Sequence, residues 1–455
     1  MIGPFLTHFK RKTFRARPIN RARSHARGLI PTVIILSICL ASCAANPFAR
    51  PTSNPVSTQT STPAAPAVTP SLAPTQAATP APPDKLVIWL PPQFDPNADT
   101  PASILLKDQL DAFSAAHNNI PIEVRIKGAT GPGGLLDTLS AANVAAPLAL
   151  PDLVALSRSD LEVAALKGLL KPFNGSSSAS NDVDWFAYAR QMTLLQGSSF
   201  GLPFAGDALV LLYRPTQIKS LPTSWDALLS QGGILAFPAG DPQALFTLSL
   251  YLSAGGEVED SQHRPVLNPD QLTKVLNLFV KGTNNQNIPA WVTQYQTDGQ
   301  AWQAFKEQRS AWVVTWASNY LAELPADTTL LPLLPVGSQP LTIATGWVWA
   351  LGKPQAKSNQ LSVELAEWLV KSDFLAQWTA AAGYLPPRPT SLAAWTNQSL
   401  QTLLSQVVLS AQLRPADDLM VSLGPALRDA TLQVLKGQSD AVQAAQAASE
   451  HLKGP

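Results

Sequence analysis

Short hydrophobic runs and helical periodicity alternate along the first part of the folded chain. Apolar or alternating runs of five or six residues have the pattern of strands, and apolar residues three and four apart have the pattern of helices. Strands are predicted at 85–90, 122–126 and 152–156, and helices at 104–116, 135–146 and 161–167. This β-α-β-α-β order predicts a parallel sheet, because parallel neighbours need a crossover connection.

The ends of these predicted strands are the first places to look for a ligand. In open α/β sheets, ligands bind beyond the carboxyl ends of the strands. Trp89 stands at the end of the first strand, and Ser159 and Asp160 follow the third. The alternative is a structural role, since Ser157 or Ser159, followed by Asp160 and Glu162, would cap the predicted helix at 161–167. Both roles stay open, and they are compatible.

Helical periodicity dominates the chain after residue 270. Apolar spacing predicts helices at 272–280, 302–307, 363–381 and 426–435, with strand-like runs between them at 312–314 and 347–351. No repeat of fixed period is visible, so the sequence does not indicate a repeat protein.

The first 84 residues have the composition of a targeting segment followed by a tether. The apolar run at 29–40 follows a basic stretch and is shorter than the roughly 20 residues that span a membrane, as in a signal peptide; an uncleaved anchor is the alternative. Residues 40–43 (LASC) resemble a bacterial lipobox, which implies lipid attachment at Cys43. We therefore expect a lipoprotein signal peptide over 1–42 and a lipidated, disordered tether rich in Pro, Thr, Ser and Ala over 43–84.

Charge and cysteine content exclude several functions. The formal net charge is +1, but eight basic residues lie within 1–42, which leaves 24 basic against 31 acidic residues in the rest. A mildly acidic body does not attract nucleic-acid phosphates, so no nucleic-acid partner is expected. Both cysteines, Cys39 and Cys43, lie in the N-terminal segment, which excludes thiolate chemistry from the body. Without clustered histidines or a phosphate-binding loop, we expect neither metal nor cofactor.

Three linked motifs carry a resemblance to a known family. They are 201–207 (GLPFAGD), 209–214 (LVLLYR) and 222–226 (PTSWD). Further similar segments follow in the family's order, at 255–256, 304–305, 311–312, 345–349 (TGWVW), 383–388 (GYLPPR) and 435–439. From residue 85 onward the chain resembles the bacterial extracellular solute-binding proteins of carbohydrate ABC transporters, the group that includes maltodextrin-binding protein.

The resemblance implies a helix-rich α/β fold of the type II periplasmic-binding-protein class. Two lobes would be joined by hinge strands, with the chain crossing between them more than once. The expected division is 85–206 plus about 333–382 for the first lobe, and about 207–332 plus 383–455 for the second. The lobes of such proteins close on a solute by a hinge motion.

The resemblance also implies a function and a location. We expect a monomeric protein that captures a small solute, with a sugar or oligosaccharide as the first expectation, and delivers it to the permease subunits of an ABC importer. The lipid would anchor it to the outer face of the cytoplasmic membrane.

Aromatic and polar residues near the resembling motifs are the candidate ligand contacts, because sugars present flat C–H faces and hydroxyl groups. The leading candidates are Trp316, Trp347, Phe204 and Asp207, followed by Ser159, Asp160, Tyr384, Arg388, Trp89 and Trp349. Packing in the core is the alternative for each aromatic residue. Maltodextrin-binding relatives carry an Asp-Arg pair where alignment places Ser159 and Asp160, a departure that argues against maltodextrin as the solute.

Catalytic interpretations have weaker support. Residues 197–201 (GSSFG) match the G-x-S-x-G pattern of hydrolases, but a predicted strand follows where that pattern needs a helix. The adjacent Asp417 and Asp418 do not supply the two facing carboxyl groups of a glycosidase. We predict a binding protein and not an enzyme. The alternatives are a sensor subunit with the same fold and a lipoprotein glycoside hydrolase.

Overall fold

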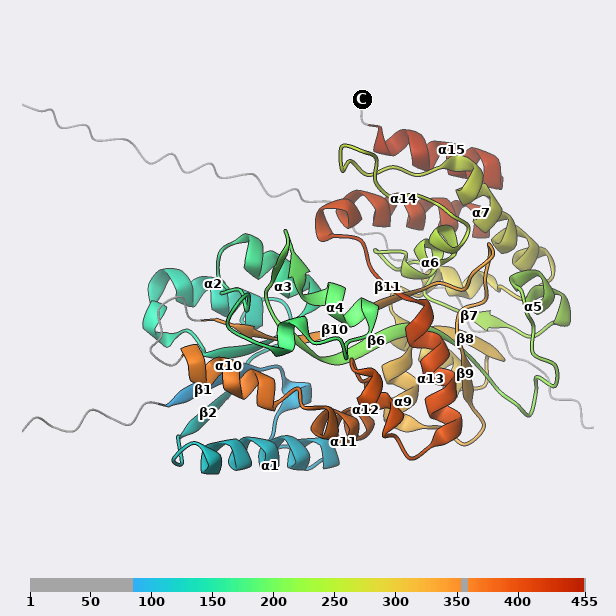
Figure 1. Ribbon diagram of the computed structural model, residues 1–455. Helices are drawn as coiled ribbons and strands as arrows, with labels where there is room; N and C mark the ends of the chain where they lie inside the picture. Colours follow the sequence, from blue (N-terminus) through green and yellow to red (C-terminus); the bar gives the residue numbers. More distant parts are fainter. Residues whose placement is uncertain (1–84, 353–358, 454–455) are drawn as a thin grey trace, which may run out of the picture. The chain divides into compact units, whose positions relative to one another are not determined.

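A computed structural model describes residues 85–352 and 359–453 (Figure 1). The predicted signal peptide, Cys43 and the tether lie outside the described residues. The described chain forms a nine-stranded sheet. Its order is β2 (Ile122–Ile126), β1 (Leu86–Leu90), β3 (Leu153–Ser157), β10 (Thr342–Leu351), β6 (Leu202–Tyr213), β8 (Trp312–Trp316) and β7 (Leu235–Ala236), with β11 (Ala411–Leu413) beside β10 and β9 (Thr329–Leu331) beside β6.

The parallel β-α-β-α-β start is confirmed. β1 pairs in parallel with both β2 and β3, and the strand bounds differ from the prediction by one residue at most. Helix α1 (Pro101–Ala116) begins three residues earlier than predicted. Thr100 accepts a hydrogen bond from the backbone of Ser103, and Pro101 occupies the first helical position, where its missing N–H costs nothing.

Two layers of helices cover the parallel strands of the first lobe. On one face, Leu86 and Ile88 pack with α1, α10 (Asn359–Trp368) and α11 (Ser372–Ala382). On the other, Val87 and Trp89 pack with α2 (Leu135–Ala145) and α3 (Arg158–Leu166). Side chains alternate along a strand, so these two sets of residues lie on opposite faces of β1. Both faces are apolar, as expected for a buried parallel strand.

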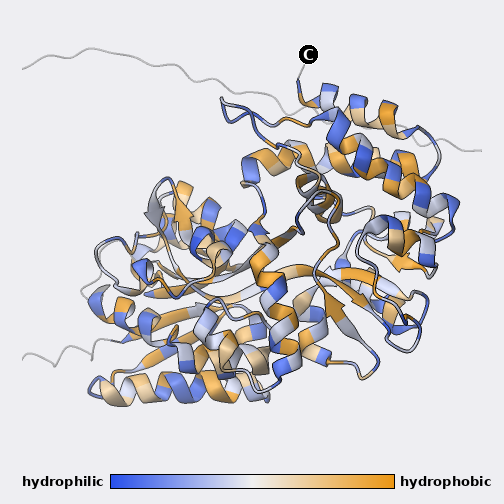
Figure 2. Ribbon diagram, turned by 45° about the vertical axis from the view of Figure 1, so that its right-hand side comes forward, coloured by the Kyte–Doolittle hydropathy of each residue, from blue (hydrophilic) through white to orange (hydrophobic). Residues whose placement is uncertain are grey.

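The second lobe repeats this layering on the other half of β6. One core joins β6 and β8 to α5 (Trp225–Gln231), α6 (Leu245–Ser253), α7 (Pro269–Asn284), α14 (Asp417–Leu435) and α15 (Ala441–Leu452). The opposite core holds α8 (Asp298–Lys306), α9 (Ala317–Glu323), α12 (Pro389–Ala393) and α13 (Gln398–Ser410). Figure 2 shows the sheet strands as mainly hydrophobic and the outer helices as mixed. The fold is therefore two-lobed α/β.

The two long strands β6 and β10 join the lobes. They pair antiparallel, with Gly206 opposite Gly346. Helix α4 (Ala187–Thr193) packs against this point, since a Cβ added to Gly206 would lie 2.0 Å from the Tyr188 hydroxyl oxygen. Leu333 and Ile343 pack in the second-lobe core, although the predicted first lobe included the chain from about 333.

Several predicted helices differ in extent from the observed ones. The segment 363–381 contains parts of α10 and α11, which are separate helices with a break between Trp368 and Ser372. Helix α14 begins at Asp417, nine residues before the predicted start at 426, and contains Pro425. The remaining short elements are β4 (Leu194–Leu195), β5 (Ser198–Ser199) and the 3-10 turns Pro92–Phe94, Pro147–Ala149, Ala179–Asn181 and Ala290–Gln294. Within the described ranges, no helix is both long and apolar enough to cross a membrane.

Candidate functional site

One face of the sheet continues from the first lobe into the second. Paired residues of neighbouring strands project to the same side, as do residues two apart along a strand. The pairs that build this face are Trp347 with Ser157, Thr345 with Asp207, and Trp316 with Leu209. We call these six residues the junction face. It places three of the leading candidates, Trp316, Trp347 and Asp207, on the same side of the sheet.

A cavity of about 130 Å³ opens between the lobes at the junction face. Its lining combines hydroxyl, amide, guanidinium, indole and aliphatic groups, from Ser157, Ser159, Gln243, Leu245, Trp316, Ile343, Thr345 and Arg414. We call it the cleft cavity. Two predicted contacts, Ser159 and Trp316, belong to it. An apolar surface with a few convergent polar groups is typical of small-molecule sites.

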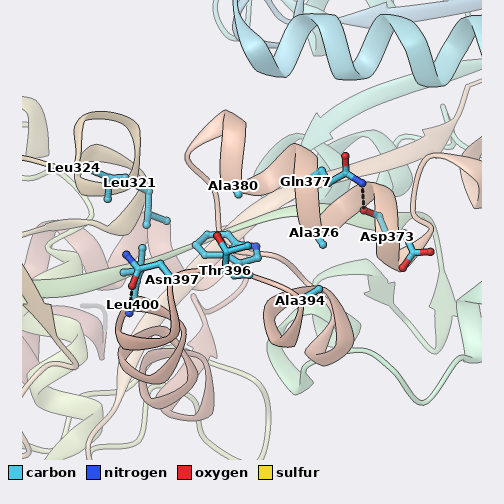
Figure 3. Close-up of a pocket in the computed structure, with 11 residues that line it drawn as sticks. Leu321, Leu324, Asp373, Ala376, Gln377, Ala380, Ala394, Thr396, Asn397 and Leu400 are labelled. Carbon is cyan, nitrogen blue, oxygen red and sulfur yellow. Dashed lines mark hydrogen bonds between the residues drawn. The ribbon is translucent and has the colours of Figure 1, made fainter.

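Larger cavities lie elsewhere in the described residues, among them one of about 170 Å³ between α14 and α15 and two of greater volume. One, of about 610 Å³, is lined from α9, α11 and α13 by residues that include Leu321, Gln377 and Leu400 (Figure 3). Another, of about 880 Å³, is lined from α4, α13 and β11. Neither is lined by a predicted ligand contact or by the carboxyl ends of the parallel strands β1, β2 and β3, beyond which ligands of open sheets bind. We therefore assign the candidate site to the cleft cavity despite its smaller volume.

Acidic side chains lie close to Trp316 on the second-lobe side. Burial raises the pKa of Asp298 to about 7, with nearby Asp241 adding to the rise and a hydrogen bond with the Trp316 side chain opposing it. Asp241 accepts hydrogen bonds from the backbone of Gln243 and Leu245, both at 3.0 Å, and so fixes the start of α6 beside the cavity. Burial also raises the pKa of Asp241, so at both positions the surroundings favour the neutral carboxyl group.

Asp207 fixes α9, the helix that follows Trp316. Its carboxylate accepts hydrogen bonds from the Ser318 backbone at 3.0 Å and from the Ser318 hydroxyl at 2.5 Å. Burial raises the pKa of Asp207 to about 7, although these hydrogen bonds oppose the rise. Since the side chain is buried, this arrangement positions the Trp316 end of β8.

An aromatic cluster occupies the first-lobe side of the junction face. The Phe94 ring lies 5.2 Å from the rings of both Phe204 and Trp347, and 5.6 Å from that of Tyr384. Phe204 stacks on Trp349 at 4.4 Å, and each is only 2% exposed, so both pack in the core. Trp347 and Tyr384 are partly buried at the edge of this cluster. Burial and the neighbouring Asp207 charge raise the pKa of Tyr384.

At the start of α3, different residues fill the two roles that the sequence left open, helix capping and contact with a ligand. Ser157 accepts the Asp160 backbone N–H at 3.1 Å and caps the helix. Ser159 lines the cleft cavity and bonds to Asp417 and Arg414. Burial raises the pKa of Asp160, one of whose carboxylate oxygens has no hydrogen-bond partner among the described residues. Ser157 is thus the cap, and Ser159 faces the cavity.

Arg388 and Trp89 lie away from the cleft cavity. The Arg388 guanidinium donates to the Val370 carbonyl at 2.8 Å and to Asp182 at 2.7 Å, and it lies 3.7 Å from the Trp185 ring centroid. Trp89 is 2% exposed in the core beneath α2 and α3. Both side chains are therefore engaged in packing the first lobe.

Arg414, Gln243 and Thr345 line the cleft cavity but were not among the predicted contacts. Arg414 follows the short strand β11, which comes directly after α13 in the chain and pairs with β10, about 70 residues earlier in the sequence. The one available signal was Thr345, which precedes the glycine and tryptophan of the motif at 345–349.

The comparisons agree with this geometry. A sequence profile described as "Bacterial extracellular solute-binding protein" matches residues 108–402, more than half of the chain. Solved structures with the same fold include maltose-bound MalE3 of T. maritima (17% identity, TM-score 0.62, covering 81% of this chain and 99% of that one). They also include the sugar-binding protein MalE of Xanthomonas citri (19%, 0.66, 81% and 98%). A third is the cyclic α-maltosyl-1,6-maltose binding protein of Arthrobacter globiformis (17%, 0.67, 81% and 98%). No curated protein matches the chain in sequence.

The layered lobes, the two connecting strands and the cavity between them define a two-lobed binding protein. The chain belongs to the bacterial extracellular solute-binding proteins. The family is extracellular, so the protein is exported.

Proposed function

We propose that this protein captures a small carbohydrate in the cleft cavity and delivers it to the permease subunits of an ABC importer. The observation that carries the proposal is the cleft cavity itself, where Trp316 stands among hydroxyl, amide and guanidinium groups contributed by both lobes. An indole ring offers a flat apolar surface to the C–H face of a sugar, and the polar groups can pair with its hydroxyls. The sugar-binding structural neighbours support the same solute class.

Solute binding drives closure of the lobes in this proposal. The cavity takes its lining from both lobes, so a bound solute makes its full set of contacts only when they are shut. Such a difference in affinity between two states is what shifts a conformational equilibrium. The connecting strands β6 and β10 are the elements about which the lobes would move. We propose the lobe division near Thr345, where β10 leaves the second core.

The protein binds its solute without turning it over. The family is described by solute binding, which supports this part of the proposal. Ser199 of the hydrolase-like pattern is 7% exposed, and its hydroxyl bonds to the Gly201 carbonyl at 3.2 Å. A buried serine used in this way supports a structural role for the motif.

A lipid at Cys43 would hold the protein at the outer face of the membrane. We propose that the anchored protein is a monomer. Each buried acyl methylene contributes about 0.8 kcal/mol, so two or more chains give a stable anchor. The lipobox-like residues 40–43 support this part of the proposal.

A thermal-shift screen tests the proposed function. Purified full-length protein would be heated with glucose, galactose, tagatose and maltose, and with amino acids and polyamines as other solute classes. A ligand at a hundred times its Kd should stabilise the fold by about 2.7 kcal/mol. A sugar-induced shift that Trp316→Ala abolishes supports the proposal. Trp368→Ala is the matched control, because Trp368 lies on α10 and bonds to the Gln109 carbonyl, away from the cleft cavity. A shift with only the other solute classes would overturn the sugar assignment.

A further inference from the structure

Four side chains form a polar network between α3 and the N-terminal end of α14. The Ser159 hydroxyl oxygen lies 3.0 Å from both carboxylate oxygens of Asp417, to which it donates, and accepts from Nη2 of Arg414 at 3.1 Å. Arg414 also pairs with Asp417. The Asp417 backbone N–H donates to Oε1 of Glu162 at 3.1 Å. We call Ser159, Glu162, Arg414 and Asp417 the α3–α14 network.

The two helices of this network belong to different lobes. Leu161 of α3 packs in the first-lobe core with β1 and β3. Leu419 and Leu423 of α14 pack in the second-lobe core with α6 and α7. Ser159 bonds to Asp417 and Arg414, and Glu162 bonds to the Asp417 backbone. These hydrogen bonds therefore join one lobe to the other.

Two members of the network also line the cleft cavity. Ser159 and Arg414 both belong to its lining. Within the described residues, the side-chain hydrogen bonds of Arg414 are made by Nη2 alone. A guanidinium group carries five N–H donors, so those on Nε and Nη1 are left for a solute. A solute in the cavity would thus contact the side chains that connect the lobes.

The charges around the network balance. Arg414 pairs with Asp417, and Arg158 lies 3.5 Å from Glu162. The side chains of Arg414 and Glu162 are only 10% and 5% exposed, so the charges need this compensation. Each guanidinium is already paired with a carboxylate, so an anionic solute finds no unpaired positive charge in the network.

We propose that Arg414, held by Asp417 and Ser159 across the two lobes, is a specificity-determining residue that binds hydroxyl groups of an uncharged sugar and couples their binding to lobe closure. This inference rests on the proposed function and adds to it both the neutral solute class and the residue that selects it. A solute hydroxyl on the free Arg414 donors completes the hydrogen bonding of the α3–α14 network, so the closed state gains contacts that the open state lacks.

Calorimetric titration of full-length variants tests the inference. The probes are glucose, galactose, tagatose and maltose as neutral sugars, and glucuronate and galacturonate as sugar acids. Asp417→Asn keeps the shape of the side chain but leaves Arg414 uncompensated. We expect it to weaken neutral-sugar binding at least tenfold and to shift the ratio of neutral-sugar to sugar-acid affinity toward the acids by at least tenfold. Arg414→Lys should weaken neutral-sugar binding to a similar extent, because lysine lacks the planar fork.

The neighbouring Asp418→Asn is the matched control, since Asp418 is exposed and bonds only to the Leu419 backbone N–H. It should leave both affinities unchanged. Small-angle scattering should show sugar-induced compaction for the wild type and Asp418→Asn, and much less for Asp417→Asn. If the wild type binds neutral sugars but Asp417→Asn and Arg414→Lys leave the Kd and the affinity ratio unchanged, the inference is wrong and the proposed function stands. If the wild type binds only sugar acids, the neutral class is refuted. If it binds no sugar at all, both proposals fail.

Discussion

Replacing Gly206 by alanine should destabilise the protein at the crossing of its two lobes. Gly206 lies on β6 opposite Gly346 of β10, and the buried Tyr188 of α4 packs directly over it. A Cβ at position 206 would lie 2.0 Å from the Tyr188 hydroxyl oxygen and 2.9 Å from its Cζ atom. Both distances are far below van der Waals contact, so Tyr188 or the strand must move.

Steric crowding and the unpaired Tyr188 hydroxyl set the expected changes in the free energy of unfolding. Overpacking a core costs about 1–3 kcal/mol, and here the crowded atom belongs to a fully buried ring, which places the cost of Gly206→Ala at about 3 kcal/mol. The Tyr188 hydroxyl has no hydrogen-bond partner among the described residues. A buried polar group without a partner costs about 1–3 kcal/mol, so Tyr188→Phe should be neutral or stabilising. The double variant should recover about 1–2 kcal/mol of the loss, because phenylalanine removes the nearest atom but keeps the ring.

Guanidinium denaturation followed by tryptophan fluorescence would measure the free energy of unfolding for this cycle. Gly299→Ala is the control, because the nearest atom to a Cβ there is the Thr297 hydroxyl oxygen at 3.9 Å. Gly299 lies in the first turn of α8, so that change should be neutral or stabilise by up to about 1 kcal/mol. A loss below about 1 kcal/mol for Gly206→Ala, or a double variant no more stable than the single one, would refute the packing argument.

Three further outcomes are expected. Burial raises the pKa of Asp207 to about 7, above the ordinary aspartate value of about 3.9, so the contribution of its protonated form to folding stability is fully present below about pH 4 and is lost as pH rises to about 7. Asp207→Asn should flatten that part of the profile of melting temperature against pH. Arg388→Ala should destabilise the fold by about 1.5–3 kcal/mol, since it removes the hydrogen bonds of a buried guanidinium to the Val370 carbonyl and to Asp182, while the solute Kd stays unchanged in calorimetry. Cys43→Ser should abolish metabolic labelling by a fatty acid and release the protein from membranes, whereas Cys39→Ser should do neither.

The first-lobe strands were predicted to within one residue, because each strand is marked by a hydrophobic pattern within its own five or six residues. The apolar runs that form β1 and β3 are buried on both faces, and the alternating run of β2 lies at the sheet edge. Helix ends were harder to predict. Helix α14 begins nine residues before the predicted start at 426 and contains Pro425, and the residues Leu423 and Ala426 on either side of this proline are buried in the second-lobe core.

The candidate site was predictable where its residues follow strands. Ser159 follows β3 and Trp316 ends β8, and both line the cleft cavity. Phe204 and Trp349 had equally good aromatic chemistry, but stacking in the core uses their ring faces. Arg414 gave no signal, since its place in the cavity depends on the pairing of β11 with β10, a contact between distant parts of the chain.

Calorimetric titration of the full-length protein with neutral sugars, followed by chemical analysis of the recovered sugar, would show whether the protein captures a sugar without turning it over. We expect saturable binding of one sugar molecule per chain, loss of that binding in Trp316→Ala, and recovery of the sugar unchanged. Hydrolysis of the sugar during the titration, or full binding by Trp316→Ala, would contradict this expectation.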